Sequence, residues 1–308
     1  MITSTSFAPA NPISTNRLTF FLGTHHPGWL KHISVPLFVS DTRLRAYRTL
    51  PVAQGPVAYD SGGFTELQRQ GRWTVPPAEY VARLRRYRDE IGNMLWAAPQ
   101  DWMCERVMIN GGRVGPIEFV GTRQFIDPNG WLTDAQMVWE HQIRTIDNLV
   151  QLRQLAPDLT ITPAVQGDTA EDYVRCVDLY WERAGIDLTH EPLVLVGSMC
   201  RRQGMDEAGQ ILTALHRVGV TRLHGLGFKT LGVIRFGDLL TSADSLAWSE
   251  EARKRRQPVI GCPGRVRQPG TPLKNCANCA HYALDWRSRL LRRVGTAPRQ
   301  LMLGEVID

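Results

Sequence analysis

The stretch Val57-Ala58-Tyr59-Asp60-Ser61-Gly62-Gly63-Phe64 places an acidic residue directly after a short apolar run and follows it with two glycines. The apolar run predicts a buried strand, and the carboxyl end of such a strand is where α/β enzymes keep catalytic groups. The glycines allow a sharp turn and a close approach of the backbone to a ligand. Taken alone, the stretch also fits an ordinary turn that Asp60 caps.

The same order of strand, polar exit and helix recurs along the chain. It predicts an α/β fold, a (β/α)8 barrel of the TIM type, with an open doubly wound sheet as the alternative. No Gly-x-Gly-x-x-Gly followed by an acidic residue is present, which argues against a dinucleotide-binding fold. Residues 110–130 are rich in glycine without a clear period and are expected to form a long loop. Strands are expected at 18–23, 35–39, 57–59, 94–98, 159–165 and 193–196, and helices at 133–155, 170–184, 206–218 and 230–236.

The length of 308 residues accommodates a barrel of roughly 250 residues with appendages. Residues 1–16, rich in Ser, Thr, Asn and Pro, are expected to form a flexible arm, and residues 17–308 a single barrel domain. No apolar run reaches the roughly 20 residues that cross a bilayer, and no secretory leader is recognisable at the amino end. We therefore expect a cytoplasmic protein without a membrane segment.

The formal net charge is +6, and the last quarter of the chain is strongly basic, beginning with Arg253-Lys254-Arg255-Arg256. Such a distribution suits a polyanionic partner, because each neutralised phosphate releases counterions. A solvated surface is the alternative. Of the six cysteines, Cys262, Cys276 and Cys279 lie close together in the sequence. In a cytosolic enzyme such a cluster indicates metal ligands rather than disulfides.

Polar residues gather at the predicted strand exits and would share one rim of a barrel. Two carboxylates facing each other across a pocket can break a glycosidic bond, with one as nucleophile and the other as acid and base. Amide and carboxyl groups would read a purine edge while Phe64 stacks on the base. Paired histidines in Thr24-His25-His26-Pro27-Gly28 would bind metal or phosphate, or form a structural turn. The exit residues are Asp60, Asp101, Gln166, Gly197, His224 and Asp244.

The order of these motifs resembles the tRNA-guanine transglycosylase superfamily over roughly residues 18–290. It runs from the Asp60 stretch through Val165-Gln166-Gly167, Gly197 and His224-Gly-Leu-Gly227 to Asp244-Ser245-Leu246-Ala247 and the cysteine cluster. Thr24 to Gly28 and Pro99-Gln-Asp-Trp-Met-Cys-Glu105 make the chain most similar to the DNA-modifying branch, the DpdA-type enzymes.

The resemblance implies a role for each matching residue. Asp244 would be the nucleophile that forms a covalent ester with the sugar, and Asp60 the general acid and base. Asp101 would read the amino edge of the base. Independently of the resemblance, Asp244 also fits a helix cap and Gln166-Gly167 a simple turn. The other substrate contacts would come from Ser61, Gly62, Gly63, Phe64, Gln166, Gly167, Gly197, His224 and Gly225.

The implied activity is exchange of guanine in DNA for a 7-deazaguanine base, 7-cyano-7-deazaguanine (preQ0), which would protect the DNA from restriction. Two alternatives stay open: a transglycosylase acting on tRNA, and a non-catalytic nucleic-acid-binding partner subunit. Helper proteins or a homodimer are possible partners.

The resemblance also implies a structural zinc ion in a subdomain at about 258–294. The family usually has two cysteines separated by one residue, a third two residues further on, and a distant histidine. This chain keeps the last pair as Cys276-Ala-Asn-Cys279, has Cys262 well upstream, and offers only His281 downstream. Three thiolates and one imidazole would close a tetrahedral zinc site, although another fourth ligand is possible.

Overall fold

The computed structural model describes residues 18–199, 206–260 and 275–296. Its centre is a curled sheet of eight parallel strands in the order β4-β3-β2-β1-β10-β9-β8-β7. This confirms the predicted α/β class. The strands are β1 (Thr19–Thr24), β2 (Leu37–Ser40), β3 (Val57–Asp60), β4 (Met94–Ala97), β7 (Ala164–Val165), β8 (Val194–Val196), β9 (Leu223–Gly225) and β10 (Ser242–Ser245).

The two edges of the sheet meet just before β7. Ala97 of β4 forms a parallel bridge with Ile161. The Ala97 amide donates to the Thr160 carbonyl at 2.9 Å, and the Thr162 amide donates to the Ala97 carbonyl at 3.0 Å. The arrangement is therefore consistent with a TIM-type barrel rather than with an open doubly wound sheet.

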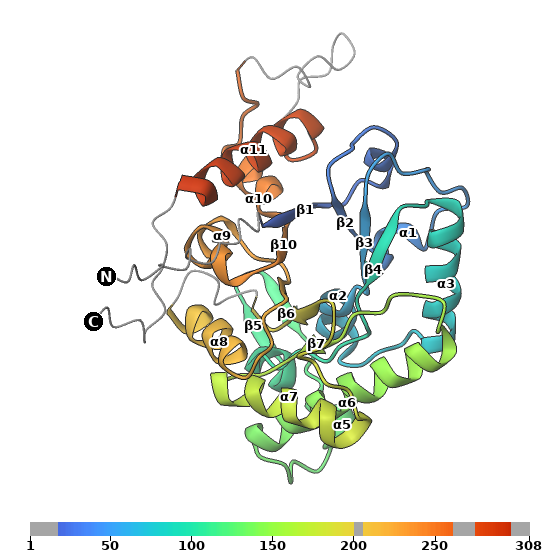
Figure 1. Cartoon of the computed structure of the whole chain (residues 1–308), viewed down its shortest axis with the longest axis vertical. Helices are drawn as coiled ribbons and strands as arrows, with labels where there is room; N and C mark the ends of the chain where they lie inside the picture. The colour runs from blue at the N-terminus through green and yellow to red at the C-terminus, as the bar shows by residue number, and fades with distance from the viewer. Residues whose placement is uncertain (1–17, 200–205, 261–274, 297–308) are drawn as a thin grey trace, which may run out of the picture.

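Helices surround the strands, with α3, α6, α7, α8 and α9 spread around the sheet in Figure 1. Capping boxes begin α6 at Thr133 and α7 at Thr169, as the sequence predicts for Thr133. The helices are η1 (Pro27–Lys31), α1 (Asp41–Leu44), α2 (Gly63–Gln70), α3 (Pro77–Glu90), α4 (Arg106–Asn110), α5 (Arg123–Ile126), α6 (Asp134–Leu155), α7 (Ala170–Ala184), α8 (Asp206–Arg217), α9 (Thr230–Phe236), η2 (Gly237–Leu239), α10 (Ala247–Lys254) and α11 (Ala280–Thr296).

The alternation of side chains along each strand separates an inner from an outer core. Phe21, Ala58 and Trp96 belong to a small inner cluster, whereas Phe20 and Tyr59 belong to the large cluster under the helices. Because side chains two residues apart in a strand share a face, the Asp60 side chain points into the interior, as that of Ala58 does. Asp244 likewise stands level with Phe21 in the β1–β10 register.

The segment between β4 and α6, residues 105–132, is called the insert below. The expectation of a structureless loop at 110–130 was wrong, because the segment holds an antiparallel hairpin of β5 (Gly112–Val114) and β6 (Ile117–Phe119) and the short helix α5. The amide of Val120 donates to the carbonyl of Gln68 on α2 at 3.0 Å, so the insert packs beside the Asp60 turn.

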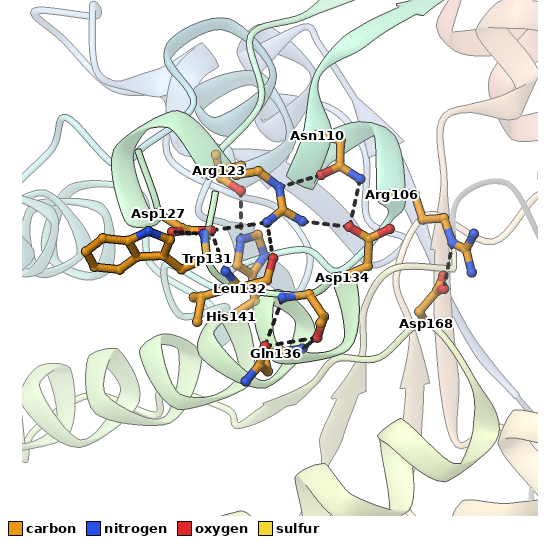
Figure 2. Close-up of polar contacts among 12 residues, drawn as sticks. Arg106, Asn110, Arg123, Asp127, Trp131, Leu132, Asp134, Gln136, His141 and Asp168 are labelled. Atoms are coloured by element: carbon orange, nitrogen blue, oxygen red, sulfur yellow. Dashed lines mark hydrogen bonds and ion pairs between the residues drawn. The ribbon is translucent and has the colours of Figure 1, made fainter. Parts of the chain in front are cut away.

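One half-buried arginine, Arg123, ties the insert together, as Figure 2 shows. The Arg123 guanidinium donates to Asn110 Oδ1 at 2.8 Å, to the Leu132 carbonyl at 2.7 Å and to Asp134 Oδ1 at 2.6 Å. Asp127 accepts the amide of Leu132 at 2.8 Å. These side-chain bonds hold together the part of the insert that lies outside the β5–β6 hairpin.

Two expectations fall outside the described residues, namely the flexible arm at 1–16 and the position of Cys262. Within the described ranges, no helix has the length and apolar character needed to span a membrane.

Candidate active site

Asp60 and Asp244 project from β3 and β10 toward the same interior, with β2 and β1 between them in the sheet. Asp244 is only 6% exposed, and Asp60 is half-buried. The negative charge of Asp244 raises the pKa of Asp60, so the two carboxyl groups interact across the interior. The structure thus brings together the two residues that the sequence predicts to be catalytic.

The surroundings of Asp60 favour its neutral form. Burial raises the pKa of Asp60 to about 6, and the charges of Asp244 and Asp41 add to the effect. Hydrogen bonds from the Ser40 hydroxyl and the Gly62 amide oppose it. A carboxyl group with a pKa near neutrality can both release and accept a proton, as a general acid and base must.

Asp244 lies in the opposite kind of environment, because hydrogen-bond donors surround it. The amide of Gly227 donates to Asp244 Oδ1 at 2.8 Å, and His224 Nε2 lies 3.3 Å from the same oxygen. Ser242 Oγ lies 2.8 Å from His224 Nδ1. A nucleophilic carboxylate only accepts hydrogen bonds, so the arrangement places the imidazole proton on Nε2 and lets Nδ1 accept from Ser242.

His224 is fully buried behind Asp244. Its ring packs against Trp96 at 4.8 Å and Phe21 at 5.7 Å between centroids. We interpret His224 as the residue that orients Asp244. Its contact with the base stays a prediction, as do the roles of the other predicted site residues.

Asp101 and Gln166 meet at the rim between β4 and β7. Gln166 Nε2 donates to Asp101 Oδ2, and the Ser198 hydroxyl donates to Gln166 Oε1 at 2.5 Å. The Cys104 amide donates to Ser198 Oγ at 2.7 Å. A Cβ on Gly197 would lie 2.1 Å from Gln166 Nε2, so only glycine leaves space for this amide.

Asp101 also belongs to the electrostatic group around Asp60. Burial raises the pKa of Asp101 to about 7, and the charge of Asp60 is the next cause. The hydrogen bond from Gln166 acts in the opposite direction. Asp60 on β3 therefore interacts electrostatically with Asp101, which follows β4, and with Asp244 on β10.

The Asp60 turn holds its glycines for definite reasons. Gly62 has a φ of +83°, and a Cβ on Gly63 would lie 3.2 Å from Asp101 Oδ1. Ser61 Oγ is buried and has no hydrogen-bond partner among the residues that the structure describes. Phe64 contacts Phe119 of the insert edge-on, with ring centroids 5.9 Å apart. Gly63, one of the predicted base contacts, thus lies beside Asp101.

Two predicted pocket glycines have a packing role. A Cβ on Gly167 would lie 2.8 Å from Tyr173, and one on Gly225 would lie 2.6 Å from Phe228. Ser198 was not predicted as a site residue, although it is a polar residue at the exit of β8, one position after Gly197. Its φ of +53°, uncommon for a residue other than glycine, is visible only in the structure.

A comparison with protein-family models places this geometry in a known group. The model for DpdA, described as DeoxyPurine in DNA protein A, matches residues 16–302. The chain belongs to the DpdA family. Membership implies a transglycosylase that acts on DNA in deazapurine modification, as the resemblance predicted. No curated protein matches the chain.

In this DpdA-family chain three of the predicted zinc ligands, Cys276, Cys279 and His281, lie near the start of α11. Cys276 is buried, and its Sγ accepts the Val259 amide at 3.3 Å. The Cys279 amide donates to the Cys276 carbonyl at 3.1 Å, so both thiols belong to one tight turn. His281 is exposed. In the described part of the chain no three His, Cys, Asp or Glu side chains are grouped to hold a metal. Cys262 lies outside that part, so the ligand set stays a prediction.

The paired histidines of the DpdA-family chain occupy the rim at the end of β1. His25 stacks flat on Trp248, with centroids 5.7 Å apart and planes 6° apart. Its Nε2 lies 2.9 Å from Asn278 Oδ1 in the cysteine turn. The His26 ring is 4.2 Å from His25. The motif therefore connects the catalytic rim to the cysteine turn.

Proposed function

We propose that this chain exchanges guanine in DNA for a 7-deazaguanine base, 7-cyano-7-deazaguanine or a close derivative, through a covalent ester between Asp244 and the sugar. The observation that carries the proposal is the coupling of two carboxyl groups with different surroundings at one rim. Asp60 has a pKa raised to about 6, and Asp244 accepts N–H donors. Family membership, which implies DNA as the substrate, supports the choice of polymer.

In the first half-reaction a carboxylate oxygen of Asp244 attacks C1′ of the deoxyribose, and the C1′–N9 bond breaks. The bond electrons leave with guanine, which takes the proton held by Asp60. In duplex DNA the target nucleotide first has to rotate out of the stack. The sugar stays on the enzyme as an ester while the free base leaves the pocket.

In the second half-reaction the incoming deazaguanine binds in the same pocket. Asp60 takes the proton from N9, N9 attacks C1′, and the ester to Asp244 breaks. Asp101 and Gln166 would read the polar edge of the base, and the hydrogen bond from Ser198 to the Gln166 amide supports this role. Water has to be kept out, because hydrolysis of the ester would leave an abasic site.

A structural zinc ion in the turn of Cys276 and Cys279 belongs to the same proposal, with Cys262 and His281 as further ligands. The amide donated to Cys276 Sγ suits a thiolate, which is a better acceptor than a thiol. The ion would fix the turn that holds Asn278 against His25. It takes no part in the chemical steps.

The experiment incubates the purified protein with radiolabelled guanine and either plasmid DNA or bulk tRNA. We expect label in DNA only. Label in tRNA alone would favour the tRNA enzyme, and label in neither polymer would favour the non-catalytic subunit.

Covalent trapping then tests the role of Asp244. Wild-type protein should form a DNA adduct that survives denaturing electrophoresis, and Asp244→Asn should not. An adduct formed by Asp244→Asn at the wild-type level would remove Asp244 as the nucleophile. DNA exchanged with 7-cyano-7-deazaguanine should resist restriction enzymes that cut the unexchanged control.

A further inference from the structure

The rim between the two catalytic strands carries a cluster of positive charge. The β1 turn lies between β10, which bears Asp244, and β2, whose Ser40 bonds to Asp60. Arg43 lies on α1, which directly follows β2, and Arg253 lies on α10, which follows β10. Both charges lower the pKa of His25, after burial as the largest cause. Arg43 and Arg253 are called the rim arginines below.

The rim arginines stand out because, in the described part of the chain, neither forms an ion pair with an acidic side chain; the charge of Arg253 acts on Glu250 without a direct contact. Both are exposed, and neither makes an ion pair or side-chain hydrogen bond with any residue that the structure describes. By contrast, Arg83 of α3 bonds to Asp41 at 2.8 Å. Beside Arg253 on α10, Glu250 is already engaged by Lys254 at 2.8 Å and by Lys229 at 3.8 Å.

The surface between the rim arginines is rigid. Trp248 is fully buried and donates its indole N–H to the Gly23 carbonyl at 2.9 Å. Stacking on Trp248 and the contact with Asn278 fix the His25 ring. Two unpaired guanidinium groups around a fixed ring match an anion, because planar guanidinium groups bind phosphate oxygens well.

We propose that Arg43 and Arg253 bind the phosphates that flank the target nucleotide of the DNA strand. This inference rests on the proposed function, since a sugar placed on Asp244 has its phosphates at the rim beside β10. The contact is to the backbone and carries no base information, so it positions the strand without selecting a sequence. It holds the sugar against Asp244 while no base is attached.

The test compares wild-type protein with Arg43→Ala, Arg253→Ala and the double variant. The probe is a fluorescein-labelled oligodeoxynucleotide, whose binding is measured by anisotropy over a range of salt concentrations. Each lost phosphate contact should lower the slope of log affinity against log salt by about 1, and the double variant by about 2. KM for DNA should rise while kcat in the base-exchange assay stays unchanged.

The matched control is Arg45→Ala. Arg45 is exposed at the end of the same short helix α1, and it is not among the charges that act on His25. Its salt slope should equal that of the wild type. If the double variant keeps the wild-type KM and the wild-type slope of log affinity against log salt, the inference is overturned. The proposed function still stands in that case, provided that the wild type exchanges the base in DNA. If the wild type exchanges no base in DNA but the slopes fall as expected, the proposed function fails and the phosphate site stands.

Discussion

Replacing Asp101 by asparagine is expected to stabilise the folded protein at alkaline pH and abolish base exchange. Asp101 is 5% exposed, and its pKa stands at about 7 against an ordinary 3.8. Each tenfold change in proton affinity is worth about 1.4 kcal/mol, so keeping this carboxylate ionised in the fold costs on the order of 4 kcal/mol. The new amide loses one acceptor oxygen at a cost of about 1–3 kcal/mol. Asp101→Asn should therefore raise the free energy of unfolding at about pH 8 by about 1–3 kcal/mol.

The sign of the pH dependence follows from the raised pKa. Between the ordinary pKa of 3.8 and about 7 the folded protein holds a proton that the unfolded chain has lost. The stability contributed by that proton is present at low pH and is lost as pH rises through about 7. The advantage of Asp101→Asn should thus shrink by about 2–3 kcal/mol between about pH 8 and about pH 5.

Thermal unfolding at the two pH values measures this effect. One kcal/mol corresponds to roughly 2 °C for a chain of this size, so Asp101→Asn should unfold several degrees above wild type at about pH 8. Asp127→Asn is the control and should lower the Tm at about pH 8. Hydrogen bonds lower the pKa of Asp127, the one from the Leu132 amide being the largest cause, so its ionised form stabilises the fold. A Tm shift for Asp101→Asn that is the same at both pH values, or negative at about pH 8, would refute the reasoning.

Three further predictions concern other parts of the molecule. Gly197→Ala puts a Cβ 2.1 Å from Gln166 Nε2, so kcat/KM for base exchange should fall sharply at a stability cost of about 1–3 kcal/mol; an unchanged kcat/KM would contradict the proposed Gln166 role. Arg123→Ala removes the bonds that tie the insert, so limited proteolysis should cut first within 105–132, and a wild-type cleavage pattern would count against this. Cys276→Ser should lose zinc in metal analysis while Cys176→Ala keeps it, and equal zinc in both variants would exclude Cys276 as a ligand.

The sequence predicted most of the fold because its signals are local. The helix at 170–184 has the expected bounds, since the Thr169 cap and the apolar spacing act within a few residues. The strand expected at 159–165 is regular only at Ala164–Val165. Pro163 has no amide hydrogen to donate to the ladder, which explains the short element. Helix α2 was missed because it begins with glycine, a poor helix former.

The candidate site was predictable only in part for a related reason. Asp60 and Asp244 stand at strand ends, and a strand end can be recognised from neighbouring residues. The contacts of Ser198 with Gln166 and of Gly227 with Asp244 join residues that are distant in the chain. No local sequence pattern encodes such contacts. They form only in the folded, curled sheet, so they could not be predicted from the sequence.

The local surroundings also bear on which carboxyl group takes which proposed role. A nucleophile has to carry negative charge at the moment of attack, and the Gly227 and His224 N–H groups directed at Asp244 stabilise such charge. An acid has to hold a proton near neutral pH, and burial beside other carboxylates gives Asp60 a pKa of about 6. The different surroundings of the two carboxyl groups thus favour Asp60 as the acid and Asp244 as the nucleophile. If the roles were exchanged, Asp60 would have to be ionised although burial opposes its charge. Asp244 would have to be protonated although the N–H donors around it stabilise a negative charge.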